Sequence, residues 1–141
     1  MKVVALDLGD RWVGVAISDA LKMTCRPYDT VELHELEKFL KDFLKREPIE
    51  VVVVGLPITL KGTESDQTRK IKKQADYFKS KMESFGISIK WVFWDERLSS
   101  KMASSGARTP EAKRREHAVA ASYILQGYLD YSANECDTVG R

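Results

Sequence analysis

The sequence contains little cysteine, proline or glycine and no long hydrophobic run. Its 141 residues include 2 Cys, 4 Pro and 8 Gly, which excludes a disulfide-stapled scaffold, a collagen-like chain and a low-complexity protein. Cys25 and Cys136 stand far apart in no CxxC spacing, which argues against a zinc knuckle or redox motif and favours free thiols in a reducing cytoplasm. Asp7 interrupts the first apolar run before a signal-peptide core forms, and no later run approaches the length of a membrane span. We therefore expect a cytoplasmic protein with no membrane partner.

Length and charge indicate one domain with locally basic segments. A chain of 141 residues with 43% hydrophobic residues suits a single core. Residues 61–81 carry seven Lys or Arg against three acids, residues 97–117 carry six against two, and residues 28–60 carry four against seven. Two basic segments fit contact with a polyanion such as nucleic acid. On charge alone, solvated helix faces are the simpler interpretation.

Hydrophobic periodicity predicts an α/β fold with a mixed sheet. Two apolar runs flank a turn at residues 9–11 and form a hairpin, and Pro27 indicates that the strand after it lies at a sheet edge. Later strands alternate with amphipathic helices, as in parallel crossovers. The predicted strands span 2–8, 12–18, 25–32, 49–54 and 87–94; the predicted helices span 34–46, a long segment ending before Gly86, a short segment near 99–105, and 110 to about 131. Helices should cover the faces of this sheet.

Three places at strand or helix ends carry groups suited to metal chemistry. Asp7 lies inside an otherwise apolar strand, where a carboxylate is costly to bury unless it is paired or binds a cation. Asp95 and Glu96 end the last predicted strand, and carboxylate oxygens from two strand ends suit Mg²⁺ or Mn²⁺. Alternation places Asp95 and Glu96 on opposite faces, so the sequence leaves the choice between them open. His117 begins the apolar stripe of the last helix, where it is either a packed core residue or a ligand above a strand end.

Four sequence blocks in the right order resemble the YqgF-type, or RuvX-like, family, whose members are described as Holliday-junction resolvases and as nucleases that mature pre-16S rRNA. The opening block, DxGxxxxGvAxsD, alone also resembles sugar kinases, actin and the Hsp70 ATPase. The four blocks together cover nearly the whole chain. They are Asp7-Leu8-Gly9 with residues 14–19, Gly55-Leu56-Pro57 with Gly62-Thr63, residues 95–99 (DERLS) and residues 120–129 (AASYILQGYL).

The resemblance implies an RNase H-like fold, with a five-stranded mixed sheet of order 3-2-1-4-5 and helices on both faces. It implies one nuclease domain over residues 1–131, followed by a short C-terminal tail over 132–141. It also implies a Mg²⁺ or Mn²⁺ site formed by Asp7, an acid of the Asp95–Glu96 pair and a residue at the start of the last helix.

The third ligand position departs from the family pattern. The family usually has Asp there, in a D-x-x-A-A arrangement, whereas this chain has His117-Ala118-Val119-Ala120-Ala121. A neutral imidazole ligates Mn²⁺ and also serves to position or deprotonate water. Loss of one negative charge should weaken Mg²⁺ binding, so we expect a preference for Mn²⁺.

The leading functional hypothesis is a metal-dependent endonuclease that cleaves structured RNA during 5′-end maturation of pre-16S rRNA, with precursor ribosomal particles as a further partner. We expect phosphate contacts from six basic residues: Arg97, Lys70, Lys72, Lys73, Arg114 and Arg115. The alternatives are cleavage of branched DNA as a Holliday-junction resolvase, which needs two active sites on a two-fold axis, and a non-catalytic RNA-binding assembly factor. We expect a monomer or a weak dimer. A phosphotransferase is disfavoured because one domain supplies only one of the two lobes that clamp a nucleotide.

Overall fold

The computed structural model describes residues 1–56, 66–95 and 110–139. The order of strands and helices along the chain is the predicted one. The elements are β1 (Lys2–Leu8), β2 (Trp12–Ser18), β3 (Cys25–Glu32), η1 (Leu33–Glu35), α1 (Leu36–Arg46), β4 (Ile49–Leu56), α2 (Asp66–Ser84), β5 (Lys90–Asp95) and α3 (Pro110–Val139). The short helix expected near residues 99–105 falls outside the described residues.

The strands form one mixed sheet of order β3-β2-β1-β4-β5, which confirms the predicted order. β1, β2 and β3 pair antiparallel, whereas β4 pairs parallel to β1, and β5 parallel to β4. Pro27 lies in β3 at the edge of the sheet, where its missing N–H interrupts no second ladder. The parallel pairs bring the carboxyl ends of β1, β4 and β5 to one edge of the sheet.

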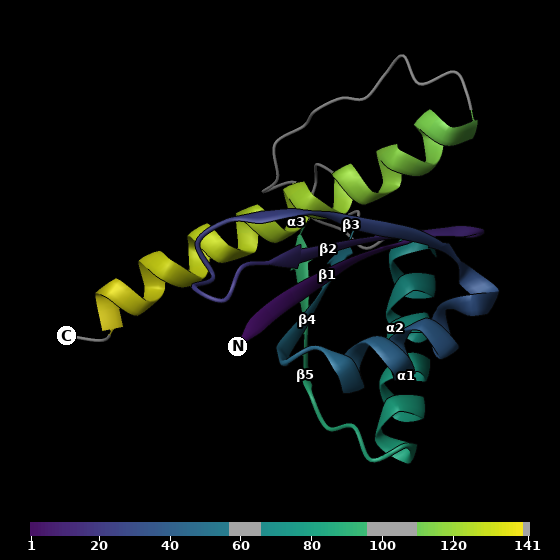
Figure 1. Ribbon diagram of the computed structural model, residues 1–141, viewed down its shortest axis with the longest axis horizontal. Coiled ribbons are helices and arrows are strands. Elements are labelled where there is room, and N and C mark those ends of the chain that lie inside the picture. The colour runs from purple at the N-terminus through teal and green to yellow at the C-terminus, as the bar shows by residue number, and fades with distance from the viewer. Residues whose placement is uncertain (57–65, 96–109, 140–141) are drawn as a thin grey trace.

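Alternate residues of each strand enter two separate cores. Val4, Leu6 and Leu8 of β1 pack with the buried faces of α1 and α2. Val3 and Ala5 point the other way and pack with α3 residues that include Ala121 and Leu125. Figure 1 shows α1 and α2 together on one side of the sheet and α3 alone on the other. Helices therefore cover both faces, as predicted.

Several element boundaries differ from the prediction. α1 begins at Leu36 because the 3₁₀ helix η1 occupies residues 33–35, and β5 ends one residue later than expected, at Asp95. β4 continues through Leu56 because Gly55 stays in the ladder, opposite Trp94. β5 begins at Lys90 because α2 ends in a left-handed Gly86 with φ of 85° and Ile87 N–H donates to the Met82 carbonyl, so residues 87–89 form a connection.

Helix α3 continues to Val139, past the expected end near Tyr131, because no proline or glycine stops it between Gly127 and Gly140. None of the helices in these described ranges combines the length and apolar character needed to cross a membrane.

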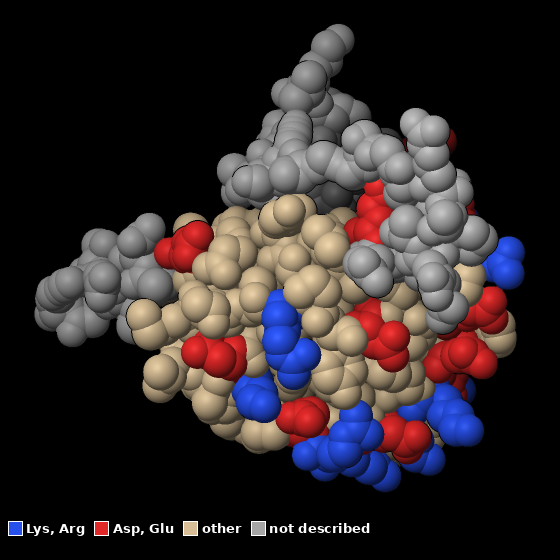
Figure 2. Space-filling view, turned by 45° about the horizontal axis from the view of Figure 1, so that its top comes forward, with Lys and Arg blue, Asp and Glu red and all other residues tan. Residues whose placement is uncertain are grey.

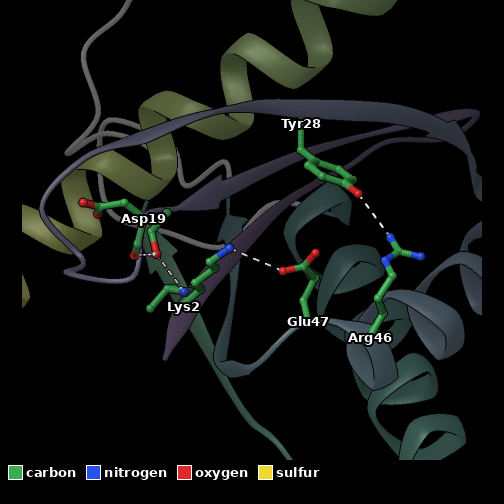
Figure 3. Close-up of polar contacts among 7 residues, drawn as sticks. Lys2, Asp19, Tyr28, Arg46 and Glu47 are labelled. Atoms are coloured by element: carbon green, nitrogen blue, oxygen red, sulfur yellow. Dashed lines mark hydrogen bonds and ion pairs between the residues drawn. The ribbon is translucent and has the colours of Figure 1, made fainter.

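Polar contacts fasten the outer elements to the sheet. Figure 3 shows Lys2 of β1 pairing with Glu47 after α1 at 3.4 Å, and Arg46 of α1 donating to the Tyr28 hydroxyl of β3 at 3.2 Å. On the opposite face, the Cys25 thiol donates to the Ser122 carbonyl of α3 at 3.1 Å. Burial, with a smaller effect of Asp130, raises the pKa of this thiol to about 11, so it stays protonated near neutral pH.

Candidate functional site

Asp7 occupies the carboxyl end of β1 and belongs to the sheet face that α3 covers. Its strand neighbour on that face, Ala5, is fully buried in the α3-side core. The intervening residues Leu6 and Leu8 belong to the opposite core. Asp7 itself is only half-buried, so it lies at the boundary between the apolar core and the solvent at the carboxyl end of β1.

His117 is brought to Asp7 by direct contact between helix α3 and strand β2. Asp7 pairs in register with Gly14, on the same face. A Cβ atom built on Gly14 would overlap the carbonyl group of His117 and would lie 2.8 Å from the Ala118 nitrogen. The backbone of α3 therefore rests on Gly14, and His117 lies immediately above the strand next to Asp7. These two predicted site residues, separated by more than a hundred positions in sequence, converge.

Two glycines flank Asp7 in the sheet. Gly14 flanks Asp7 on β2, and on β4 the residue one step beyond the pair Leu6–Val54 is Gly55. Neither glycine projects a side chain between the carboxylate and α3. Asp7 therefore offers an oxygen donor at the carboxyl end of its strand, between two glycines and next to His117. This arrangement suits a divalent cation that takes oxygen and nitrogen ligands.

The register of β5 separates positions 95 and 96. Asp95 pairs with Leu56, whose side chain belongs to the core under α1 and α2. Trp94 pairs with Gly55 and belongs to the α3-side core, the face of Asp7. Position 95 therefore falls on the face opposite Asp7. Glu96 and Arg97 lie outside the described residues.

The predicted phosphate-binding lysines lie on α2, on the other side of the sheet from His117. Lys70, in the first part of α2, pairs with Asp10 of the β1–β2 turn at 2.6 Å, so it reaches the sheet edge where Asp7 stands. Lys72 is half-buried and Lys73 exposed. Figure 2 shows Lys and Arg gathered along the lower margin of the molecule and interspersed with Asp and Glu. Arg114 and Arg115 belong to α3 just before His117.

A mixed sheet of this order, with a carboxylate at the end of its first strand and helices on both faces, defines the RNase H-like fold. Solved structures with the same fold include Thermus thermophilus RuvC, both alone and in complex with a Holliday junction substrate. Each superimposes with a TM-score of 0.58 at 12% sequence identity, and the alignment covers 94% of this chain and 96% of RuvC in the complex, and 95% and 97% for RuvC alone. Nucleases with this fold are typically metal-dependent.

The chain belongs to the RuvX family, whose description is "Holliday junction resolvase" and whose family model matches residues 1–131. A relative from Rubrobacter xylanophilus is 38% identical over 133 residues, which is 92% of each protein. A relative from Clostridium botulinum is 37% identical over 139 residues, covering 92% of this chain and 97% of the relative. Both carry the name "Putative pre-16S rRNA nuclease". Family membership and the RNase H-like fold confirm the sequence-based assignment.

Sequence reasoning missed the contribution of Gly14 and Gly55 to the site. Their signal was present in the sequence, because a glycine inside a strand weakens it and often marks a close backbone approach. The partner in that approach is the backbone of α3, which is identified only by the three-dimensional packing.

Proposed function

We propose that this protein is a divalent-metal-dependent endonuclease that hydrolyses phosphodiester bonds in structured RNA, with 5′-end maturation of pre-16S rRNA as its cellular reaction. The observation that carries the proposal is the convergence of Asp7 and His117 across the contact of α3 with Gly14. The names of the relatives support rRNA as the substrate. We place the activity in residues 1–131 of a cytoplasmic monomer or weak dimer that acts on precursor ribosomal particles.

In this proposal Asp7, Glu96 and His117 hold the cation. Position 95 falls on the wrong face for this role, so we assign the carboxylate ligand of the Asp95–Glu96 pair to Glu96. Two carboxylates and one imidazole form a donor set that fits Mn²⁺ and, less well, Mg²⁺. The chemistry supplied by such a cation is Lewis-acid stabilisation of the charge that builds on the phosphate oxygens during hydrolysis.

The remaining predicted site residues bind the substrate. Lys70 exchanges its exposed ion pair with Asp10 for an RNA phosphate at little cost, because surface ion pairs contribute only about 0–1 kcal/mol. Arg97 contacts the scissile phosphate or orients the acids. Lys72, Lys73, Arg114 and Arg115 contact neighbouring phosphates.

Isosteric variants test the proposal. Asp7→Asn and Glu96→Gln should each lower the rate of cleavage of a pre-16S rRNA fragment by about a hundredfold or more, because each removes a charged ligand. Asp95→Asn is the matched control, since it removes the neighbouring carboxylate, and it should retain most activity. Cleavage assays in Mg²⁺ and Mn²⁺, with melting temperatures to establish folding, give the readout. Full activity of folded Asp7→Asn would refute the nuclease proposal, and inactivity of Asp95→Asn with full activity of Glu96→Gln would reverse the ligand assignment.

His117 determines the choice of metal in this proposal. Imidazole supplies no negative charge, so Mg²⁺, which prefers oxygen ligands, should support cleavage less well than Mn²⁺. The His117→Asp variant should raise Mg²⁺-supported cleavage and lower the ratio of the Mn²⁺ to the Mg²⁺ rate. Metal titrations of both proteins measure this ratio. An unchanged ratio would show that His117 is not a ligand.

Cleavage of branched DNA is the second candidate, because the family description is that of a Holliday-junction resolvase. A resolvase cuts two strands symmetrically and therefore needs a dimer with two active sites. Paired incisions in a four-way DNA junction by a dimeric protein, without cleavage of the rRNA fragment, would favour this candidate. Binding of the rRNA fragment without cleavage in either metal would instead favour a non-catalytic assembly factor.

A further inference from the structure

A second group of metal-ligating side chains lies where β3 passes into α1 (Figure 1). Glu32 ends β3, and His34 and Glu35 lie in the short helix η1 that follows. One donor atom from each residue, a carboxylate oxygen or an imidazole nitrogen, lies within 4.8 Å of the others. None of the three belongs to the site at Asp7 or to the family motifs.

Local backbone geometry brings these donors together. Glu32 is extended, and η1 then turns the chain back over the next residues. This turn brings Glu35 back toward Glu32, so that their donor atoms lie within 4.8 Å of each other. The backbone is held on both sides, because Glu32 pairs with Trp12 in the sheet and Leu33 N–H donates to the Arg11 carbonyl at 2.7 Å.

The donor spacing fits a small cation. His34 Nε2 lies 3.2 Å from Glu32 Oε2. Two neighbouring ligands bound at 2.0–2.2 Å around a tetrahedral or octahedral ion stand about 2.8–3.6 Å apart, so this pair already has the separation of neighbouring ligands. The imidazole of His34 is 72% exposed and the Glu35 side chain is also exposed, so closing the remaining distance requires no movement of the core.

The surroundings attract a cation and repel a phosphate. An open hollow of about 500 Å³ is lined by Asp10, Arg11, Glu32, Leu33 and His34. A second hollow of about 430 Å³ also has Glu32 in its lining, together with Asp29 and Glu35. Carboxylates outnumber the single guanidinium in these linings. RNA is therefore disfavoured as the occupant of this surface.

The Arg11 guanidinium competes with a metal cation for the Glu32 carboxylate. Its guanidinium pairs with Glu32 Oε1 at 3.5 Å, while His34 contacts the other oxygen of the same carboxylate. The Arg11 side chain is 74% exposed, so its pair with Glu32 is weak. A divalent ion replaces one screened monovalent contact with three ligand bonds.

We propose that Glu32, His34 and Glu35 form a binding site for a transition-metal cation at the junction of β3 and α1. The imidazole nitrogen and two carboxylates favour Zn²⁺ over Mg²⁺, because Mg²⁺ prefers oxygen ligands and Zn²⁺ stands near the top of the affinity order for mixed donors. The bound ion ties the end of β3 to the start of α1. The proposal does not depend on the nuclease function.

Histidine NMR tests the proposal directly, because the chain has only 2 His. Ring nitrogen–proton spectra of ¹⁵N-labelled protein are recorded during titration with ZnCl₂, in an Asp7→Asn background that removes a ligand of the proposed nuclease site. His34→Gln and His117→Gln assign the two sets of signals. We expect the His34 signals to shift and saturate at one equivalent of Zn²⁺, and the melting temperature to rise with Zn²⁺ concentration. His34 signals unmoved by millimolar ZnCl₂ would overturn the proposal.

Charge-removing variants establish whether the three residues act together. Glu32→Gln and Glu35→Gln should each weaken Zn²⁺ binding by about tenfold or more. Arg11→Gln should strengthen it, because the competing cation is removed. Glu37→Gln, which changes a nearby half-buried acid outside the group, is the matched control and should leave the affinity unchanged. Equal affinity in the Glu32→Gln/Glu35→Gln double variant and the parent would show binding by the imidazole alone and would overturn the site.

Discussion

Asp19 shows how one side chain organises the turn between β2 and β3. Its Oδ1 accepts hydrogen bonds from the backbone N–H groups of Met23 at 2.9 Å and Thr24 at 3.2 Å. The bonds from Thr24 and then Met23 lower the pKa of this carboxyl below its ordinary value of 3.8. Lys22 adopts a left-handed φ of 59° in the same turn, so the side-chain bonds stabilise an uncommon backbone conformation.

The lowered pKa predicts how this turn responds to acid. Because the carboxylate is favoured in the folded state, Asp19 stabilises the protein above pH 3.8, and this stabilisation is lost as pH falls through the lower folded-state pKa. Asp19→Ala should lower the melting temperature at pH 7, and the difference from wild type should shrink below pH 3.8. Asp19→Asn keeps an uncharged acceptor, so its melting temperature should fall less at pH 7, and its difference from wild type should also shrink as the wild-type carboxylate becomes protonated. A wild-type–Ala difference that is constant from pH 7 to pH 2 would contradict this account.

At the scale of elements, the contact of β2 with α3 places the candidate site. Gly14 allows the α3 backbone to lie directly on the strand at His117 and Ala118. Below this contact, the small residues Ala16 and Ala121 continue the close approach, and both are fully buried. The N-terminal part of α3 is therefore held by backbone packing as well as by its apolar side chains.

Substitution of Gly14 tests this contact. In Gly14→Ala the added methyl group overlaps the His117 carbonyl, so α3 must shift. We expect a loss of about 1–3 kcal/mol of unfolding free energy, together with a large loss of cleavage activity. Gly86→Ala is the control, since no atom lies within 4 Å of its added Cβ and only backbone strain at φ of 85° opposes it. It should cost about 1 kcal/mol and leave cleavage intact. Denaturant unfolding and cleavage assays measure both, and wild-type activity in Gly14→Ala would exclude this positioning role.

At the scale of the molecule, charge is distributed in local groups on a nearly neutral chain. The net charge is +2. The N-terminal part of α2 carries Lys70, Lys72 and Lys73 near the edge of Asp7, whereas the surface around Glu32 and Glu35 is acidic. The two groups meet at Asp10, which pairs with Lys70 and lines the acidic hollow. We expect a polyanion to bind on the α2 side of this boundary and a cation on the β3 side.

Salt dependence of RNA binding tests that distribution. If each of the three lysines Lys70, Lys72 and Lys73 contacts one phosphate, changing all three to Gln should reduce the slope of log K against log salt by about 2, at about 0.7 per phosphate for single strands. The matched control changes Lys79, Lys81 and Lys90, which lie toward the other end of α2 and at the start of β5. Its slope should change little. Equal slopes in the two triple variants would indicate that the RNA does not follow the N-terminal part of α2.

Much of this architecture was predictable because its signals are local. Short segments of sequence specify single elements, as the alternation in β2, the amphipathic pattern of α1 and the apolar run of β4 show. The position of Asp7 at a strand end and its motif indicated the site. The end of α2 before Gly86 was predicted, whereas the start of β5 at Lys90 and the continuation of α3 to Val139 were misjudged, because the exact ends of elements depend on which backbone groups find partners.

The sequence by itself determined the order and type of the elements, the family, and the candidate ligands Asp7 and His117, since periodicity and motif are properties of short segments. Only the tertiary structure decided that Asp7 faces α3, that position 95 does not share its face, and that Glu32, His34 and Glu35 converge. The physical reason is that faces and registers arise from pairing between distant segments, and a shift by one residue in either partner would reverse them.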